Sequence, residues 1–506
     1  MTDPTLSVRS PDGPELNGEV SVVIMGAGPA GLTAAWELVH NGVRVNVLEA
    51  DPVKVGGIAR TASYKGFRFD IGGHRFFTKA PEVTRLWHEI LSPEDWLTVP
   101  RLSRIYYRGK FFSYPLKPFD ALSKLGIVRT SMCMLSYFKA KVFPIRPERS
   151  FEDWVINRFG ARLYRIFFKT YTEKVWGMPC DQISADWAAQ RIKGLSLVKA
   201  IRNAFSRSPQ DADGKVIKTL IEEFEYPKFG PGMMWERAAE KIRSRGGKVH
   251  MHTPVTCLVY ADGKLRHVQV SGGDGARTFT GSQFISTLPI RDLVSMMQPP
   301  PPEAVRAAAQ ALNYRDFLTV VLVVNRAELF PDNWIYIHEP SVRLGRIQNF
   351  KNWSPAMVPD LSKSALGLEY FCTEGDDLWS MPDDELIELG RREVAELGLA
   401  RSGEIEDGTV VRMKKAYPVY DEHYERNVSV VRDFIREQMP NLQLVGRNGM
   451  HKYNNQDHSM MAALLAARNI LGETWDPWKV NTDAEYHEEV RDNHDSAARL
   501  VPRTVK

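Results

Sequence analysis

Three glycines near the start of the chain constrain its fold more than any other feature. The sequence VVIMGAGPAG begins with an apolar run, Val22–Met25, as a strand buried on both faces requires, and Gly26, Gly28 and Gly31 follow it. Leu32–Val39 then shows the spacing of a helix. We therefore predict a strand-to-helix turn. There, the first glycine permits a tight bend, the second lets a pyrophosphate approach the backbone, and the third lets helix and strand pack closely.

A second apolar run, VRVNVLE, ends at Glu49, whose carboxylate can accept hydrogen bonds from a ribose diol. Beyond it, Gly56-Gly57 and Arg60 would bring a flexible backbone segment and a cation to the same pyrophosphate. FAD domains of the glutathione-reductase type commonly have this element, whereas nicotinamide domains do not need it. The chain contains one such fingerprint, so we predict bound FAD and no separate NAD(P)H domain. A glycine turn in an ordinary sheet is the alternative.

The composition limits the partners and the redox chemistry that we expect. The 506 residues suffice for two or three domains, and 66 basic against 62 acidic residues leave a formal charge of +4. This balance implies no nucleic-acid tail and allows only a modest bias toward anionic ligands. Four cysteines, Cys133, Cys180, Cys257 and Cys372, lie far apart without a C-x-x-C pair, so we expect no metal site and no disulfide framework. This pattern fits a reducing cytoplasm.

Two segments bear on targeting and on membranes. Residues 1–18 lack a charged start followed by an apolar core, so we expect a disordered tail rather than a signal peptide. The chain has no apolar run of about 18 residues, so no membrane span is expected. Residues 127–143 are apolar with interspersed cations. We predict a helix that is buried or lines a groove, since most amphipathic helices face a core; a helix resting on a bilayer surface is the alternative.

The apolar patterns predict an α/β protein in several pieces. Around residues 248–259 and 264–289 we expect strands that return to the first sheet, and a linker at Pro299–Pro302 precedes the strand LTVVLVV and the helical stretch DDELIELGRREVAELG. The predicted fold class is a discontinuous glutathione-reductase-type FAD-binding Rossmann domain with an inserted helical and mixed α/β substrate domain. The predicted divisions are a disordered tail at 1–18, FAD-binding parts at 19–94, 226–296 and 411–475, a helical substrate insertion at 95–225, a second substrate part at 297–410 and a C-terminal tail at 476–506.

Several segments occur in an order found in one group of flavoproteins. They are GAGPAGLTAAWEL, VGGIART, DIGGHRFFTK, RIYYRGKFFSYPL, YTEKVWG, YPVYD and GRNGMHKYNNQDHSM. Over most of the chain they resemble the UDP-galactopyranose mutase and protoporphyrinogen oxidase branch of the amine-oxidase-like flavoproteins. The central segment RLYRIFFKTYTEKVWG is similar to the mutases, whereas FEYPKFGPGMMWERAAEKI and GLEYFCTEGDDLW resemble the oxidases.

The resemblance implies roles for individual residues. His74 stands where the mutases have a histidine beside the isoalloxazine, with Gly73 in place of their proline. It would tune flavin protonation or accept a sugar hydroxyl. Tyr171 and Trp176 match residues that line the nucleotide and sugar pocket, where aromatic faces stack on a base or a ring. A structural role is the alternative for each of the three.

The resemblance also implies a diphosphate site and a flavin site. Arg315 resembles the mutases' diphosphate-gripping arginine, with a solvated surface arginine as the alternative, and Tyr417 and Tyr453 match tyrosines that hold the diphosphate. Residues 446–460 match the segment that closes over the flavin. The residues expected to bind FAD are Gly26, Gly28, Pro29, Ala30, Gly31, Glu49, Ala50, Gly56, Gly57, Arg60, Gly72, Gly73, His74, Val255, Gly446, Arg447, Asp457 and Met460.

Besides Gly73, the chain departs from the mutase pattern at three places. The stretch AAQRIKGLSLVKAI lacks the mutases' second diphosphate arginine, for which Arg191 or Lys193 would have to substitute. His451 stands where a tyrosine is common, and Phe77 stands where the mutases have a second histidine. These departures indicate a substrate other than simple UDP-galactose.

Two activities follow from the resemblance. In the first, which we rank ahead of the second, reduced FAD attacks the anomeric carbon of a nucleotide- or lipid-linked sugar. The pyranose and furanose forms of that sugar then interconvert in glycan biosynthesis. In the second, an oxidase or desaturase takes a hydride from a hydrophobic or amine substrate. Either needs a small-molecule substrate and an external reductant or electron acceptor, while membrane contact and a homodimer stay open. A flavin-free binding protein is a third hypothesis, opposed by the joint presence of Glu49, Arg60, His74 and Arg447.

Overall fold

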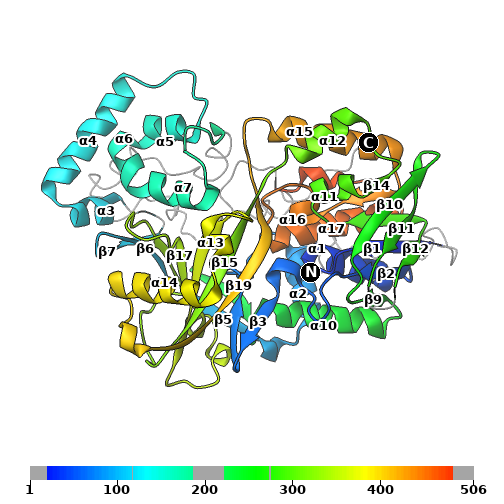
Figure 1. Ribbon diagram of the computed structural model, residues 1–506, viewed down its shortest axis with the longest axis horizontal. Helices are drawn as coiled ribbons and strands as arrows, with labels where there is room; N and C mark the ends of the chain where they lie inside the picture. Colours follow the sequence, from blue (N-terminus) through cyan, green and yellow to red (C-terminus); the bar gives the residue numbers. More distant parts are fainter. Residues whose placement is uncertain (1–19, 115, 117, 186–221, 273–274, 482–506) are drawn as a thin grey trace, which may run out of the picture.

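A five-stranded parallel sheet lies in one half of the computed structural model, which describes residues 20–114, 116, 118–185, 222–272 and 275–481 (Figure 1). The strand order is β20-β13-β1-β2-β9. The strands are β1 Ser21–Met25, β2 Arg44–Leu48, β9 Lys248–His250, β13 Gln283–Ser286 and β20 Leu442–Leu444. Segments far apart in the sequence therefore lie side by side. The predicted tail at 1–18 and the substitutes Arg191 and Lys193 lie outside the described residues.

Both faces of this sheet are covered. Val22 and Ile24 pack against helices on one face, whereas Val23 and Met25 pack against a second sheet and its helices on the other. The helices on the first face are α1 Pro29–His40, α2 Pro81–Ile90, α10 Pro231–Ser244 and α17 Gln456–Ile470. Those on the second are α11 Ile290–Ser295, α12 Glu303–Gln310 and α15 Tyr424–Gln438. Because neighbouring strand residues point to opposite faces, the apolar run Val22–Met25 of β1 needs this cover on both sides.

The second sheet corrects one prediction. Of the strands expected to return to the first sheet, β9 and β13 do so, but three others form their own antiparallel sheet. That sheet contains β10 Val255–Ala261, β11 Lys264–Val270 and β12 Arg277–Thr280, with β14 Met297–Gln298 parallel to β10. The reason is the two-residue turn Asp262-Gly263, in which both residues have positive φ and which folds β11 directly back onto β10.

A seven-stranded sheet forms the core of the other half, in the order β19-β15-β18-β17-β16-β6-β7. Its strands are β6 Ser103–Tyr107, β7 Lys110–Ser113, β15 Tyr314–Val324, β16 Trp334–Ile337, β17 Arg346–Asn349, β18 Ser364–Cys372 and β19 Ile405–Pro418. α14 (Asp383–Glu396) covers one face. The predicted strand LTVVLVV and helix at 383–396 are confirmed as β15 and α14. The predicted division at residue 411 falls inside β19.

A group of helices packs on the β6 and β7 end of that sheet, at the upper left of Figure 1. They are α3 Pro118–Leu125, α4 Ile127–Val142, α5 Phe151–Phe159, α6 Ala161–Tyr164, the π-helical η3 Arg165–Lys169 and α7 Thr170–Trp176. α4 confirms the helix expected at 127–143, and the prediction that it is buried or lines a groove holds for one side only. The side with Cys133, Tyr137 and Ala140 is buried, because the neighbouring helices α3, α5 and α6 cover it, whereas the other side is exposed.

Short elements connect the two halves. β3 (Thr61–Tyr64) pairs with β4 (Phe67–Asp70), and β5 (Trp96–Pro100) pairs with β8 (Glu223–Pro227). The remaining elements are η1 Gly57–Ala59, η2 Pro93–Asp95, η4 Phe350–Asn352, η5 Pro355–Met357, α13 Asp377–Ser380, η6 Ser402–Glu404, α16 Gly446–Gly449 and η7 Pro477–Lys479. The predicted mixed α/β class is confirmed. Among the described residues, no helix is long and apolar enough to cross a membrane.

Candidate active site

A cavity of about 1350 Å³ extends from the turn after β1 to the aromatic residues of η3 and α7. It collects side chains from both halves of the molecule. Of the residues predicted to form the site, its wall contains Gly26, Gly28, Pro29, Ala30, Glu49, Gly57, Arg60, Gly72, Gly73, His74, Tyr171, Trp176, Tyr417, Gly446, Arg447, Tyr453 and Asp457.

Two glycine loops meet at one end of the cavity. Gly26 has φ +100°, and a Cβ on Gly31 would lie 1.9 Å from the carbonyl oxygen of Gly26. Gly31 therefore allows α1 to pack against the turn, as predicted, and does not itself line the cavity. Gly28 and Gly57 face each other, since a Cβ on Gly57 would lie 3.4 Å from Cα of Gly28. The two loops lie against each other and both line the cavity with backbone rather than side chains, which is the surface that a pyrophosphate needs.

Glu49 and Arg60 lie beside these loops. One carboxylate oxygen of Glu49 accepts the Ala27 amide at 2.8 Å, and the other accepts the Asp51 amide at 2.9 Å. Burial raises the pKa of Glu49, and the two backbone hydrogen bonds oppose that shift. Arg60 forms an ion pair with Asp51 at the cavity wall. The carboxylate is thus held in position for a ribose diol by the backbone rather than by another side chain.

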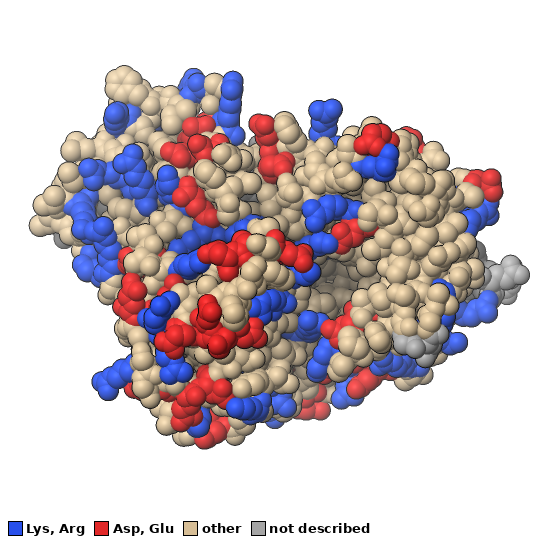
Figure 2. All heavy atoms as spheres, in the orientation of Figure 1, with Lys and Arg blue, Asp and Glu red and all other residues tan. Residues whose placement is uncertain are grey.

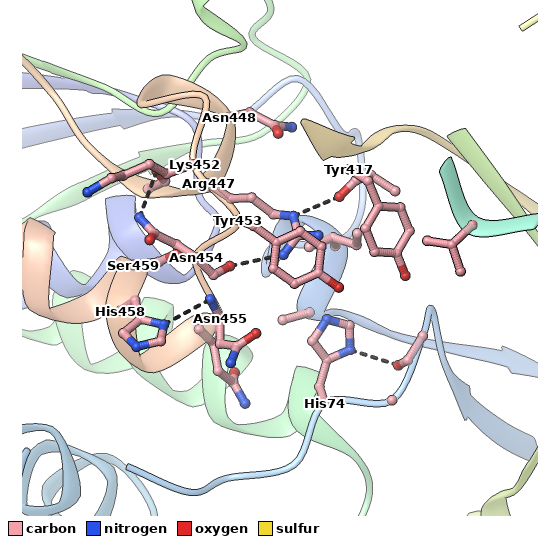
Figure 3. Close-up of a pocket in the computed structure, with 18 of the residues that line it drawn as sticks. His74, Tyr417, Arg447, Asn448, Lys452, Tyr453, Asn454, Asn455, His458 and Ser459 are labelled. Atoms are coloured by element: carbon pink, nitrogen blue, oxygen red, sulfur yellow. Dashed lines mark hydrogen bonds between the residues drawn. The ribbon is translucent and has the colours of Figure 1, made fainter. Parts of the chain in front are cut away.

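His74 lies across the cavity from the Tyr453 ring (Figure 3). Its Nδ1 is 2.8 Å from the carbonyl oxygen of Gly72. A carbonyl only accepts, so Nδ1 carries the proton and Nε2 is left as an acceptor. Burial, with the charges of Arg447 and Arg346, lowers the pKa of His74 to about 4. At neutral pH this residue therefore offers an uncharged acceptor to the cavity.

Tyr417, Tyr453 and Arg447 form a layered group on the opposite wall. The two rings are stacked with centroids 5.7 Å apart, and the Arg447 guanidinium lies 4.1 Å from the Tyr453 centroid and 5.0 Å from that of Tyr417. Arg447 also donates to the carbonyls of Ala416 at 2.7 Å and Asn454 at 3.0 Å. Both hydroxyls point toward the His74 side (Figure 3). Burial raises the pKa of Tyr417, so its hydroxyl stays a hydrogen-bond donor at neutral pH.

Two cavity residues on β17, Arg346 and Gln348, and the buried Glu369 on β18 form a polar group that the sequence analysis missed. Arg346 and Glu369 are direct cross-strand neighbours, with nitrogen to oxygen distances of 2.5 and 2.7 Å. Nε2 of Gln348 donates to the other oxygen of Glu369 at 2.8 Å. Glu369 is fully buried. Burial alone would lower the pKa of Arg346, but the charge of Glu369 outweighs this effect, so the pKa of Arg346 is raised. A single glutamate inside the apolar run SALGLEYFC was the available signal, because a buried charge needs a partner.

Aromatic side chains from η3, α7 and β16 complete the wall. The Tyr171 ring stacks on His338 with centroids 5.0 Å apart and an interplanar angle of 4°, and it meets Tyr336 edge to face. Phe167 and Phe168 of η3 line the same side. The π-helical turn shifts α7 relative to α6, a distortion often found at functional sites.

Six predicted site residues do not line the cavity. The Arg315 guanidinium lies against Gly177, with Nε 3.4 Å from the Val175 carbonyl and Nη1 2.5 Å from Oγ1 of Thr373. Its prediction as the diphosphate-gripping arginine is not supported by this placement, and Arg346 is the arginine that faces the cavity from this sheet. The other five are Gly31, Ala50, Gly56, Val255 and Met460.

Val255 and Met460 pack in the core instead. Val255 contributes to the cluster between the parallel sheet and β10–β11. Met460 is fully buried on α17, where its sulfur accepts the Trp87 indole N–H at 3.2 Å. The segment 446–460 does reach the cavity, but an α-helix points only part of each turn toward one side, and Met460 points to the core.

The residues present fit FAD. Backbone at the two glycine loops, the Glu49 carboxylate and the Arg60 cation suit its pyrophosphate and ribose, and the N-terminus of α17 faces the cavity through Gln456, Asp457 and Ser459. A helix N-terminus favours negative charge on a bound group. Asn455 and His458 cap this helix, and Figure 3 shows them at the cavity edge.

Comparison with known proteins agrees with this fit. Residues 29–471 match the family model described as flavin containing amine oxidoreductase. The chain belongs to this family. It is therefore an FAD-dependent flavoenzyme of the amine-oxidase superfamily, and the recognition made from the sequence is confirmed.

Relatives within the family have several activities in their names. The chain is 22% identical to coproporphyrinogen III oxidase of Propionibacterium freudenreichii over 488 residues, which cover 88% of this chain and 90% of that protein. It is 26% identical to protoporphyrinogen oxidase 2 of Arabidopsis thaliana, over 37% of this chain and only 39% of that protein, and 21% identical to zeta-carotene desaturase of the same plant over 81% and 80%.

Solved structures share the fold. A reduced UDP-galactopyranose mutase superposes with a TM-score of 0.77 at 22% identity, covering 90% of this chain and 94% of the mutase. A structure titled putative protoporphyrinogen oxidase from Exiguobacterium sp. 255-15 has a TM-score of 0.67 at 17% identity, covering 89% and 98%. At these identities the likeness concerns the fold.

Proposed function

We propose that this protein is an FAD-dependent mutase that interconverts pyranose and furanose forms of a nucleotide- or lipid-linked sugar in glycan biosynthesis. One observation carries the proposal: tyrosine hydroxyls and guanidinium groups surround the part of the cavity beside His74. Tyr417 and Tyr453 point their hydroxyls there, Arg447 lies against both rings, and Arg346 lines the same cavity. Such a wall suits a sugar with an anionic leaving group better than it suits a hydrocarbon.

The two halves of the molecule would then bind different molecules. We propose that the parallel-sheet half holds FAD and that the seven-stranded sheet, with the helices on its end, holds the substrate. Bound FAD would supply the electron-rich centre that the reaction needs. The protein itself would keep a departing diphosphate near the sugar by donation from Tyr417 and Tyr453, while Nε2 of His74 accepts a sugar hydroxyl.

Positional isotope exchange tests the proposal directly. The enzyme is reduced without oxygen and given nucleotide sugars that carry ¹⁸O in the bond between the anomeric carbon and the phosphate. We expect ¹⁸O to move into a non-bridging position and furanose product to form, with no net consumption of reductant. Tyr453→Phe should slow both by about 10- to 100-fold, because it removes one donor to the leaving group. Tyr260→Phe, on β10 outside the cavity wall, is the matched control and should leave the rate unchanged.

Dehydrogenation is the second candidate, and one observation favours it. The charge of Arg346 is already neutralised by Glu369, and Ile105, Phe151 and Phe167 add apolar surface to the wall. The names of the oxidase and desaturase relatives are in line with this candidate. Absence of isotope exchange with every sugar, together with flavin reduction by an apolar or amine substrate and reoxidation by oxygen or quinone, would replace the mutase proposal with this one.

A further inference from the structure

The outer face of α4 exposes apolar side chains to an unusual degree. Among the described residues, eight of the twelve large hydrophobic side chains that are exposed lie within residues 127–145. Ile127 is 87% exposed, Leu135 70%, Phe138 57% and Val142 67%. At 100° per residue these four lie within one arc, opposite the buried Cys133 side. The face is therefore a continuous stripe rather than scattered single residues.

Cations border this stripe. Arg129, Lys139 and Lys141 lie on α4 itself, and Arg146 and Arg149 follow it. Figure 2 shows Lys and Arg side chains gathered over the region that α4 occupies at the upper left of Figure 1. Glu148 is the one acid between residues 127 and 149, and it is paired with Arg158. The surroundings of the stripe thus carry excess positive charge.

A small pocket of about 170 Å³ lies at the flank of α4 and concentrates that charge. Arg108, Arg129 and Arg162 line it, together with Tyr107, Cys133 and Ile166. In the part of the chain that the structure describes, no carboxylate forms a salt bridge with any of these three arginines. Three guanidinium groups around one recess suit an anionic phosphate ester.

We propose that α4 and the arginine pocket dock this protein onto the surface of an anionic bilayer. The apolar stripe enters the boundary between headgroups and acyl chains, and the pocket takes a phospholipid phosphate. A protein partner would need an acidic, concave complement, whereas a convex single helix with an apolar face and basic borders matches the layered chemistry of a lipid surface. The inference is independent of the chemistry in the main cavity, because it uses none of that cavity's residues.

Vesicle flotation of the full-length, FAD-loaded protein tests this inference. Vesicles of phosphatidylcholine alone are compared with an equimolar mixture of phosphatidylcholine and phosphatidylglycerol. We expect binding to the anionic vesicles and weakening with added salt. The double variant Leu135→Asp/Phe138→Asp should lower the partition coefficient by at least about tenfold, and Arg129→Gln and Arg162→Gln should each lower it by about fivefold.

A matched control separates the stripe from general surface hydrophobicity. Leu361 is 60% exposed between η5 and β18, so Leu361→Asp should leave vesicle binding unchanged. An unchanged FAD absorbance spectrum and melting temperature show that each variant is folded. Absence of binding to anionic vesicles by the wild type overturns the proposal. So does a dimer that dissociates in the Leu135→Asp/Phe138→Asp variant without lipid, since the stripe would then be covered by a second copy of the chain.

Discussion

Two glycines three positions apart, Gly28 and Gly31, show how one residue type serves different purposes. At Gly31 a Cβ would lie 1.9 Å from a backbone oxygen, so the constraint comes from the protein itself. At Gly28, which has an ordinary φ of −81°, the nearest atom to a Cβ is Cα of Gly57 at 3.9 Å. The protein alone has room there. Gly28 and Gly57 both line the cavity, so we expect the constraint at Gly28 to come from the cofactor pyrophosphate that the two loops face.

This difference predicts opposite outcomes for the same substitution. Gly28→Ala should leave the free energy of unfolding of the FAD-free protein within about 1 kcal/mol of wild type and weaken FAD binding by at least about tenfold. Gly31→Ala should destabilise the FAD-free protein by about 4 kcal/mol or more, because backbone atoms must move. Urea unfolding and fluorescence titration with FAD measure the two quantities. Normal FAD affinity in Gly28→Ala would contradict the assignment of the pyrophosphate site to the two glycine loops.

A buried histidine predicts pH dependence. His451 is 1% exposed, its Nε2 is 3.1 Å from the Val419 carbonyl, and burial lowers its pKa to about 4. Between pH 6.5 and 4 the unfolded chain binds this proton and the folded protein does not, so the free energy of unfolding falls as the pH falls through this range. The loss from this one group is up to about 3 kcal/mol. His451→Gln should flatten the curve of unfolding free energy against pH there. The raised pKa of Asp70 changes the free energy of unfolding with pH in the opposite direction. Asp70 is present in both proteins, so subtracting the curve of the variant from that of wild type removes its contribution.

At the scale of secondary structure, register decides which polar side chains meet. β17 and β18 pair so that Arg346 lies opposite Glu369, and Gln348 reaches the same carboxylate. A shift by one residue would place Arg346 on the opposite face from the cavity. The β-sheet pairing is thus what places a neutralised guanidinium at the substrate side.

Breaking this pair should be costly. Glu369→Ala leaves the Arg346 guanidinium, whose side chain is only 19% exposed, without its partner and should lower the free energy of unfolding by about 3–5 kcal/mol. The matched control is Asp377→Ala, which breaks the Arg343 pair where the carboxylate is 70% exposed and should cost less than about 1 kcal/mol. Urea unfolding of both variants gives the comparison. Equal costs would mean that Arg346 has access to water or to another acceptor.

For the whole molecule, the cavity draws its wall from segments spread along most of the chain. Gly28, His74, Tyr171, Arg346 and Arg447 all reach it. A cofactor bound there contacts several elements at once and binds the folded state only. Its binding energy therefore adds to the stability of the whole fold.

Removal of FAD should accordingly lower the melting temperature, and added FAD should restore it. At a free FAD concentration about 1,000 times the dissociation constant, the stabilisation is about 4 kcal/mol. Differential scanning fluorimetry over a series of FAD concentrations measures this. The Gly28→Ala variant should melt at the temperature of the FAD-free wild type and respond weakly to FAD. Equal melting temperatures with and without FAD in the wild type would contradict binding within this cavity.

The sequence by itself determined the features that depend on local geometry. The glycine turn after Val22–Met25 and the acid at Glu49 act through neighbouring backbone, so their spacing is readable without the fold. The amphipathic pattern of 127–143 likewise predicted a helix.

Only the tertiary structure decided what surrounds these elements. The periodicity of the sequence places apolar residues on one side of α4 but does not reveal whether another layer of the protein covers that side. Among the described residues, none covers Ile127, Leu135 or Val142, which are all exposed. Sheet register likewise brought Arg346 to the cavity and left Arg315 against Gly177. Both outcomes depend on contacts between residues far apart in the chain, which no local pattern encodes.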